Sequence, residues 1–342
     1  MTLKTSIAIL ITSITFGSLL SGPVSQEEAD SVAQFEWGSK EVENYLGYEN
    51  CLKCHQQQVE KLTTTLHFKT FETLHRSELA RSFCRAMGIR SIKREARCIR
   101  CHYTPEISPR GMRAQSGISC ESCHGPSKNW IQGHNDYGGL MITKAQETIA
   151  HRQNRIRSSI EKGMRHPSNL YLLAKSCYEC HLIDDAELVN ATDHPPISAT
   201  FNMVSWSQGT MRHNFLRAEN KSNAESSPKR LQVMFVVDLM ARLEATLTSA
   251  ADSTIDSEHA KVMQQEYSKA AKKLLTVSRR VNNQLINDVI EVLRQTPPTA
   301  SPEKQISAAK TIEKIAFQFG KNESAHELHA IQDMLPARDE YR

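Results

Sequence analysis

The chain has 342 residues, a formal net charge of +4 and 23% charged residues. This length allows one large or two ordinary domains, and the small basic excess does not indicate a nucleic-acid-binding protein. Aromatic residues make up only 6% of the chain, although Phe, Tyr and Trp normally supply much of the buried surface in a core of this size.

The first 22 residues are typical of a secretory signal peptide, with Lys4, then an apolar run, then small residues near Ser21 and Gly22. The apolar run is short for a membrane span and contains several Thr and Ser, so cleavage is favoured over a retained N-terminal anchor. Residues 23–47 are acidic and polar and are predicted to be a linker. We therefore expect an exported, periplasmic protein.

Four copies of the pentapeptide Cys-x-x-Cys-His follow. Each is the attachment sequence of a c-type haem, in which two thiols add to the porphyrin vinyl groups and the adjoining imidazole binds iron. A redox dithiol, a zinc site or a disulfide framework does not require His after each second Cys. The prediction is four covalently attached haem c groups, held by eight of the nine cysteines and four proximal histidines: Cys51, Cys54 and His55; Cys98, Cys101 and His102; Cys120, Cys123 and His124; Cys177, Cys180 and His181.

The predicted haem domain covers residues 48–216, which leaves about forty residues for each haem. That is too few to build a separate core around each one, so the haems are expected to pack closely and to form the core themselves. Haem plates would also account for the low aromatic content. The expected fold class is mainly α, a compact multihaem cytochrome c domain with little regular sheet, followed by a C-terminal helical bundle or extension.

Between the first and second motifs, residues 56–83 have apolar residues at helical spacing. His67 follows His55 by twelve residues on this predicted helix, far enough to serve another haem as its distal ligand. His75 lies about 12 Å further along, at 1.5 Å per residue, and is a second candidate for a neighbouring haem. Cys84, the ninth cysteine, is interpreted as a buried, inert thiol.

Between the second and third motifs, two prolines and two glycines indicate a loop. After the third motif, Gly125-Pro126 predicts a tight turn followed by a short helix. This helix would carry His134 back towards the haems, so His134 is predicted to be a distal ligand.

Two segments of this region resemble the cytochrome c-554 family, the tetrahaem electron acceptor of hydroxylamine oxidoreductase in ammonia-oxidising bacteria. The first is residues 51–74, with His67 twelve residues past the first motif, and the second is the run from Gly117 to His134, GISCESCHGPSKNWIQGH. The order and approximate spacing of the four motifs also match, so the resemblance covers about residues 45–215. It implies that His134 is the distal ligand of the haem held by His55, and that His67 serves the haem held by His124.

Two histidines beyond the fourth motif, His194 and His213, are candidates for the distal ligand of its haem. Both lie in polar, turn-rich surroundings. His213 is preferred, because the family's fourth distal histidine also lies some thirty residues beyond its motif. His151 and His166 are interpreted as surface or structural histidines.

The composition changes after Phe215: residues 217–229 are predicted to be a linker, and residues 230–342 a helical region without cysteine. Apolar stripes indicate helices that pack on each other, over residues 233–247, 281–293 and 309–319. Ser301-Pro302 predicts a helix start and Gly320 a helix end. The histidines of this region are interpreted as exposed helix residues: His259, His326 and His329.

Bis-histidine haems have no open iron site, and their chemistry is outer-sphere electron transfer. The predicted function is therefore a periplasmic tetrahaem c-type cytochrome that relays electrons between a redox protein donor and acceptor. Hydroxylamine oxidoreductase, an oxidoreductase of nitrogen metabolism, is a partner implied only by the resemblance. No nucleic-acid partner is expected, and a membrane is expected only if the N-terminal segment is retained.

The alternative is a haem enzyme acting on a small nitrogen species such as nitric oxide, hydroxylamine or nitrite. The resemblance implies that the haem held by His102 is five-coordinate, unless His75, which the family pattern lacks, closes it. Arg97 and Arg100 could attract an anion there, although arginine beside a haem usually pairs with a propionate. No acid–base constellation can be placed near His102, so a carrier is preferred to an enzyme. A membrane-anchored quinol-oxidising cytochrome is disfavoured by the uneven motif spacing.

Overall fold

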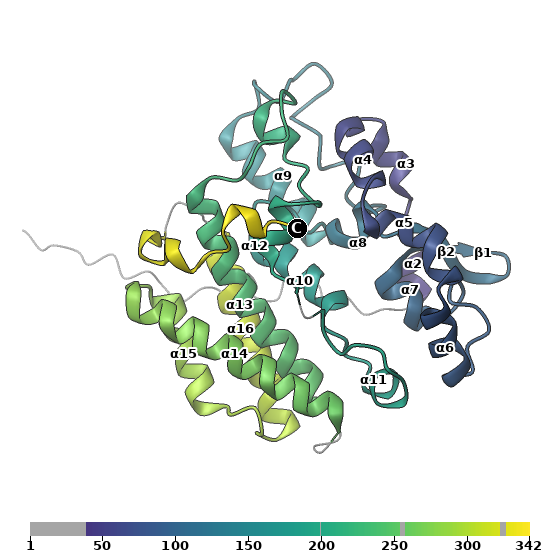
Figure 1. Cartoon of the computed structure of the whole chain (residues 1–342). Coiled ribbons are helices and arrows are strands. Elements are labelled where there is room, and N and C mark those ends of the chain that lie inside the picture. The colour runs from purple at the N-terminus through teal and green to yellow at the C-terminus, as the bar shows by residue number, and fades with distance from the viewer. Residues whose placement is uncertain (1–38, 199, 254–256, 322–325) are drawn as a thin grey trace, which may run out of the picture. The chain divides into compact units, whose positions relative to one another are not determined.

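The computed structural model describes residues 39–198, 200–253, 257–321 and 326–342. The predicted signal peptide, and the predicted linker up to residue 38, lie outside these ranges. Within them, no helix is both long enough and apolar enough to cross a membrane. Most of the described residues that have regular secondary structure are helical, and the sheet among them is a two-stranded hairpin (Figure 1). The mainly α fold class is confirmed.

Short elements carry the four motifs and the segments between them. In chain order they are α2 (Ser39–Val42), α3 (Tyr48–Leu52), α4 (Gln56–Thr63), α5 (Leu66–Thr73), η1 (Leu74–Arg76), α6 (Glu78–Ala86), α7 (Ala96–His102), β1 (Tyr103–Ser108), β2 (Gly111–Gly117), α8 (Cys120–His124), α9 (Ile149–Glu161) and α10 (Leu170–His181). The chain then continues through α11 (Ala186–Ala191), α12 (Met203–Gln208) and η2 (Phe215–Ala218).

The single helix expected over residues 56–83 is wrong, because α4, α5, η1 and α6 replace it. Thr65 makes the first break: its hydroxyl accepts a hydrogen bond from Phe68 N and caps α5. Ser77 caps α6 in the same way. Short polar side chains of this kind offer the backbone an alternative to a continuous helix. The breaks place His67 and His75 on separate elements, so the two do not share one helical stripe.

The loop expected between the second and third motifs is instead the antiparallel hairpin β1–β2. Pro105 lies next to an irregularity in the register, where a strand tolerates proline. Gly111 has a φ of +93° in the tight turn, a conformation that favours glycine. Gly117 lies against α5, where a Cβ would be only 2.0 Å from Phe68 O. The hairpin therefore joins the two motifs, and α5 packs on β2 and on α7 of the second motif.

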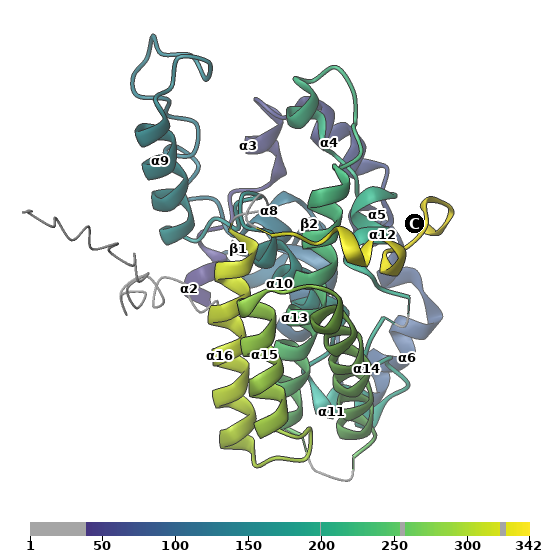
Figure 2. The ribbon, with the colours of Figure 1, turned by 90° about the vertical axis from the view of Figure 1, so that its left-hand side faces the viewer.

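Four longer helices form the C-terminal part: α13 (Pro228–Ala251), α14 (Glu258–Arg280), α15 (Gln284–Gln295) and α16 (Pro302–Gly320). They lie side by side in both views (Figures 1 and 2). The predicted stripes correspond largely to α13, α15 and α16, and α16 begins and ends where the sequence predicts. The chain closes with η4 (His329–Met334) and η5 (Arg338–Glu340).

Helix α13 is the centre of this C-terminal part. It contacts α14 and α16 and also α10, which ends in the fourth motif. Residues around almost its whole circumference are buried, as expected for a helix that is covered on several sides. The C-terminal helices are therefore attached directly to the motif region through α10.

Candidate haem-binding centre

Each motif occupies about one helical turn. The second, third and fourth motifs form the last turns of α7, α8 and α10, and the first spans the end of α3 and the N-cap of α4. Residues three apart are neighbours on a helix surface. The two thiols of each motif therefore lie close enough to reach one porphyrin edge, while the histidine that follows stands at the helix end.

Every motif histidine faces a second histidine from elsewhere in the chain. The ring centres are separated by similar distances in all four pairs, 6.3 Å for His55–His134, 6.3 Å for His102–His194, 6.2 Å for His124–His213 and 5.9 Å for His67–His181. A metal lies about 2 Å from an imidazole nitrogen, and the ring centre lies about 1 Å behind it, so two rings on opposite sides of one metal have centres about 6 Å apart. The spacing fits one iron between each pair.

Hydrogen bonds leave one nitrogen of these rings available. In four of the rings, Nδ1 donates a hydrogen bond to a backbone carbonyl oxygen. The four bonds are His124 to Arg165 O at 3.2 Å, His134 to Ile131 O at 2.6 Å, His194 to Pro195 O at 3.0 Å and His213 to Met211 O at 2.6 Å. In His67, Nδ1 lies 3.2 Å from Met211 Sδ. A bonded Nδ1 fixes the ring and leaves Nε2 as the metal-binding atom.

Burial keeps the motif histidines neutral. Desolvation, together with a smaller contribution from neighbouring histidines, lowers the pKa of His102, His124 and His181 to about 4. Only the neutral imidazole has a lone pair for a metal. At neutral pH these rings are therefore in the form that binds iron.

The other histidines of the described residues are engaged differently. His259 and His326 are buried, and each bonds a backbone carbonyl through Nε2 and a side chain through Nδ1. The expectation that these two are exposed is wrong, because both are structural hydrogen-bonding groups. His329 is exposed. His151 bonds a glutamate and His166 a serine, which agrees with their interpretation as surface or structural residues.

Two pairings differ from those expected. His67 lies opposite His181 and not His124, and His213 lies opposite His124 and not His181. The separate helix α5 explains the first difference, because Ile118 N donates to His67 O at 3.0 Å and holds the start of α5 beside the hairpin. From there the His67 ring faces the fourth motif.

His194 faces the second motif, a role that the sequence did not indicate. Leu182 and Ile197 form an isolated β-bridge, so the chain doubles back after the fourth motif and brings His194 to His102. His75, the candidate suggested for this position, lies in η1, and among the described residues His102 forms its ring pair with His194 instead. The one signal that could have found His194 is the need for a second ligand at each of four irons.

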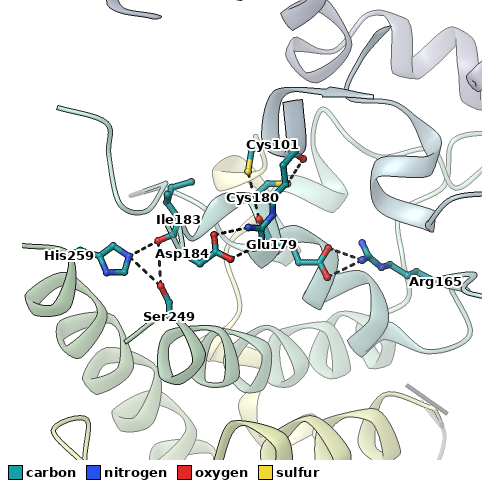
Figure 3. Close-up of polar contacts among 9 residues, drawn as sticks. Cys101, Arg165, Glu179, Cys180, Ile183, Asp184, Ser249 and His259 are labelled. Atoms are coloured by element: carbon teal, nitrogen blue, oxygen red, sulfur yellow. Dashed lines mark hydrogen bonds and ion pairs between the residues drawn. The ribbon is translucent and has the colours of Figure 1, made fainter. Parts of the chain in front are cut away.

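Contacts between the motifs order them in space as first, third, fourth, second. Helix α3, which carries Cys51 of the first motif, contacts α8 of the third motif. Helix α8 of the third motif contacts α10 of the fourth. The Cys101 thiol then contacts the backbone of the fourth motif, and the Cys180 thiol that of the second, each at 3.7 Å (Figure 3).

Ion pairs surround the second and fourth motifs (Figure 3). Arg100 makes a two-pronged pair with Asp184 at 2.7 and 2.9 Å, and Arg165 pairs with Glu179 at 2.7 Å. Arg97 pairs with the carboxylate that follows Asp184, at 2.8 Å. The two arginines considered as an anion site near the second motif are therefore bound to carboxylates, and they fasten that motif to the segment after the fourth.

Comparison with known proteins gives one family. Residues 50–125, which include the first three motifs, match the family model described as cytochrome c554 and c-prime. Cytochrome c-554 of Nitrosomonas europaea is 30% identical over 147 residues, which is 40% of this chain and 57% of that relative, so the chain spans little more than half of the relative's length. No solved structure matches the chain. Residues 50–125 are therefore similar to the cytochrome c-554 family of c-type cytochromes, and this similarity implies covalently bound haem c.

Proposed function

We propose that this protein is an electron carrier that relays electrons between redox proteins through four bis-histidine haems. The observation that carries the proposal is the set of four facing histidine pairs, one for each motif, with ring centres 5.9 to 6.3 Å apart. When bound, haems with two histidine ligands would supply outer-sphere electron transfer.

The chain contributes the axial ligands and their orientation. Each iron would receive one imidazole from its motif and one from a distant segment, so that neither axial position stays open. His194 is decisive, because it faces His102, the position that the resemblance leaves five-coordinate. This pairing supports a closed iron site, whereas an enzyme acting on small nitrogen species would need an open one.

The spatial order of the motifs supports a linear relay. The first and second motifs lie at the two ends of this series of contacts, with the third and fourth between them. Electrons would therefore enter near one terminal motif and leave near the other. The donor and acceptor are proposed to be redox proteins, and a partner like hydroxylamine oxidoreductase rests on the resemblance alone.

Export to the periplasm is part of the proposal. It rests on the apolar run and small residues of the first 22 residues and on the haem-attachment motifs, because c-type haem is attached outside the bacterial cytoplasm.

The test is a set of optical and magnetic spectra of the purified holoprotein, oxidised, then reduced with and without carbon monoxide. The expected result is four haems per chain, all low-spin, with no spectral change on adding carbon monoxide. One high-spin haem that binds carbon monoxide would contradict the closed relay and favour the enzyme. Fewer than four haems would contradict the assignment of the four motifs.

A further inference from the structure

The fourth motif is held by the C-terminal helices through one of its own variable positions. Tyr178 lies between Cys177 and Cys180, and its hydroxyl donates to Asp238 Oδ1 of α13 at 2.7 Å. The same hydroxyl accepts from Arg242 Nε at 2.9 Å. Tyr178 and Asp238 are each 2% exposed, so this is a fully internal contact between the motif and α13.

Arg242 extends this contact in two further directions. Its Nη1 pairs with Glu266 of α14 at 2.9 Å, and its Nη2 donates to Phe201 O at 3.0 Å. A buried polar network in which each member has its partners is rigid and specifies one arrangement. The network therefore fixes the backbone of Phe201 relative to the fourth motif.

Phe201 in turn lies on the iron-ligand ring of this motif. Its ring stacks on His181 with centres 4.3 Å apart and planes 16° apart. It also makes an edge contact with Tyr178, with centres 5.3 Å apart. Among the described residues, none of the other seven histidines in the four facing pairs has an aromatic ring stacked on it.

A second attachment lies on the other side of His181. The carbonyl of Ile183, two residues later, accepts from His259 Nε2 of α14 at 2.6 Å and from Ser249 Oγ of α13 at 3.4 Å (Figure 3). His259 is fully buried, and its Nδ1 accepts from Ser253 at 2.6 Å, which fixes the tautomer. The backbone on both sides of His181 is thus tied to the same pair of helices.

We propose that helices α13 and α14 are a clamp that sets the orientation of His181 and thereby the electronic properties of the fourth haem. Arg242 and Phe201 are positioning residues in this clamp. Ligand orientation and hydrogen bonding around a haem are among the means by which a protein tunes its potential. The inference rests on the proposed function, because it requires a haem at the fourth motif.

The experiment compares Phe201→Leu and Arg242→Met with the wild-type holoprotein. Electron paramagnetic resonance resolves the low-spin signals, and a spectroelectrochemical titration gives the midpoint potentials. We expect one of the four low-spin signals and one of the four potentials to shift in both variants, while the other three stay in place.

Arg294→Met is the matched control, because Arg294 lies on α15, its side chain is 68% exposed, and within the described part of the chain it pairs with a glutamate of the same helix. It should leave all four signals unchanged. If Arg242→Met does not fold, Tyr178→Phe removes the hydroxyl from the same network with little change in volume and should shift the same signal.

The outcomes separate the two proposals. Four haems in the wild type with no shifted signal in Phe201→Leu and Tyr178→Phe would overturn the clamp. An equal shift of all four signals would overturn it as well, since that indicates a global change. A wild type with fewer than four haems, counted as the pyridine haemochrome, would instead overturn the proposed function.

Discussion

The motif region and the C-terminal helices are held together differently. In the motif region, the buried hydrophobic cluster beside the second motif has three members, Ile99, Tyr103 and Ala114. Helix α13 alone buries many more apolar side chains, and α14 and α16 cover it. The motif helices are also short, from 5 residues in α3 and α8 to 12 in α10, against 24 in α13.

This difference indicates which part can complete its own core. Helices shorter than about 12–15 residues are marginal in water and depend on tertiary packing. The C-terminal helices find that packing in one another. In the motif region four pairs of imidazoles lie at a spacing that fits a metal, and under the proposed function the haem plates would supply the packing there.

The largest expected effect comes from withholding haem. A chain produced without haem attachment should lose its structure over residues 51–165, because the cofactor would supply the missing core, whereas α13–α16 should persist. Limited proteolysis followed by mass spectrometry would show rapid cleavage in the first region and protection in the second, with the holoprotein as control. Equal cleavage rates in both regions would contradict the expectation that only the motif region depends on haem for its structure.

A second effect is confined to one iron. His194→Ala should open the distal position opposite His102, since these rings face each other at 6.3 Å. We expect one haem of four to become high-spin and to bind carbon monoxide. His75→Ala is the control and should leave all haems low-spin. The reverse pattern would assign the ligand to His75.

A substitution in the core of the C-terminal helices should lower the stability of the protein without changing the haem spectra. Leu243 is fully buried in α13, so Leu243→Ala should lower the free energy of unfolding by about 2–5 kcal/mol. Leu140→Ala, at a fully exposed position in the motif region, should change it by less than about 0.5 kcal/mol. Chemical denaturation of the holoproteins measures both, and similar values for the two variants would argue against a self-contained core.

The smallest expected effect is an acid-sensitive contact in the motif region. Hydrogen bonds from Arg155 lower the pKa of Glu147 from 4.5 to about 2, and Arg155 also donates to His134 O. Because the folded-state pKa is depressed, this ion pair stabilises the segment above about pH 4.5 and its contribution disappears as the pH falls towards 2.

Hydrogen exchange of residues 139–149 should therefore accelerate between pH 5 and pH 2.5, after correction for the intrinsic rate. Glu147→Gln should exchange faster at pH 5 and show no such step. A step of the same size in the Gln variant would assign the acid sensitivity to another group.

The amino-acid sequence was sufficient to predict the mainly α fold class and the positions of α13, α15 and α16, and it carries the motifs from which haem binding is inferred. Cys-x-x-Cys-His is a local pattern, and its spacing alone brings two thiols and an imidazole to one helical turn. The stripes of α13 and α16, and the Ser301-Pro302 start, are also local signals and appear in the structure as predicted. The helix breaks at Thr65 and Ser77 were not predicted, because the capping hydrogen bond at each position competes with an apolar stripe that favours one long helix.

Only the tertiary structure decided which histidine faces which. All four pairs join residues that are 79 to 114 positions apart in the chain. Which residues meet depends on distant contacts such as the Leu182–Ile197 bridge and the hydrogen bond from Ile118 N to His67 O. The contact between the C-terminal helices and the fourth motif could not be predicted from the sequence either. Arg242 can bond to Tyr178 only because α13 packs on α10. Periodicity reports which face of an element is buried, but the identity of the opposite residue depends on how distant segments are brought together.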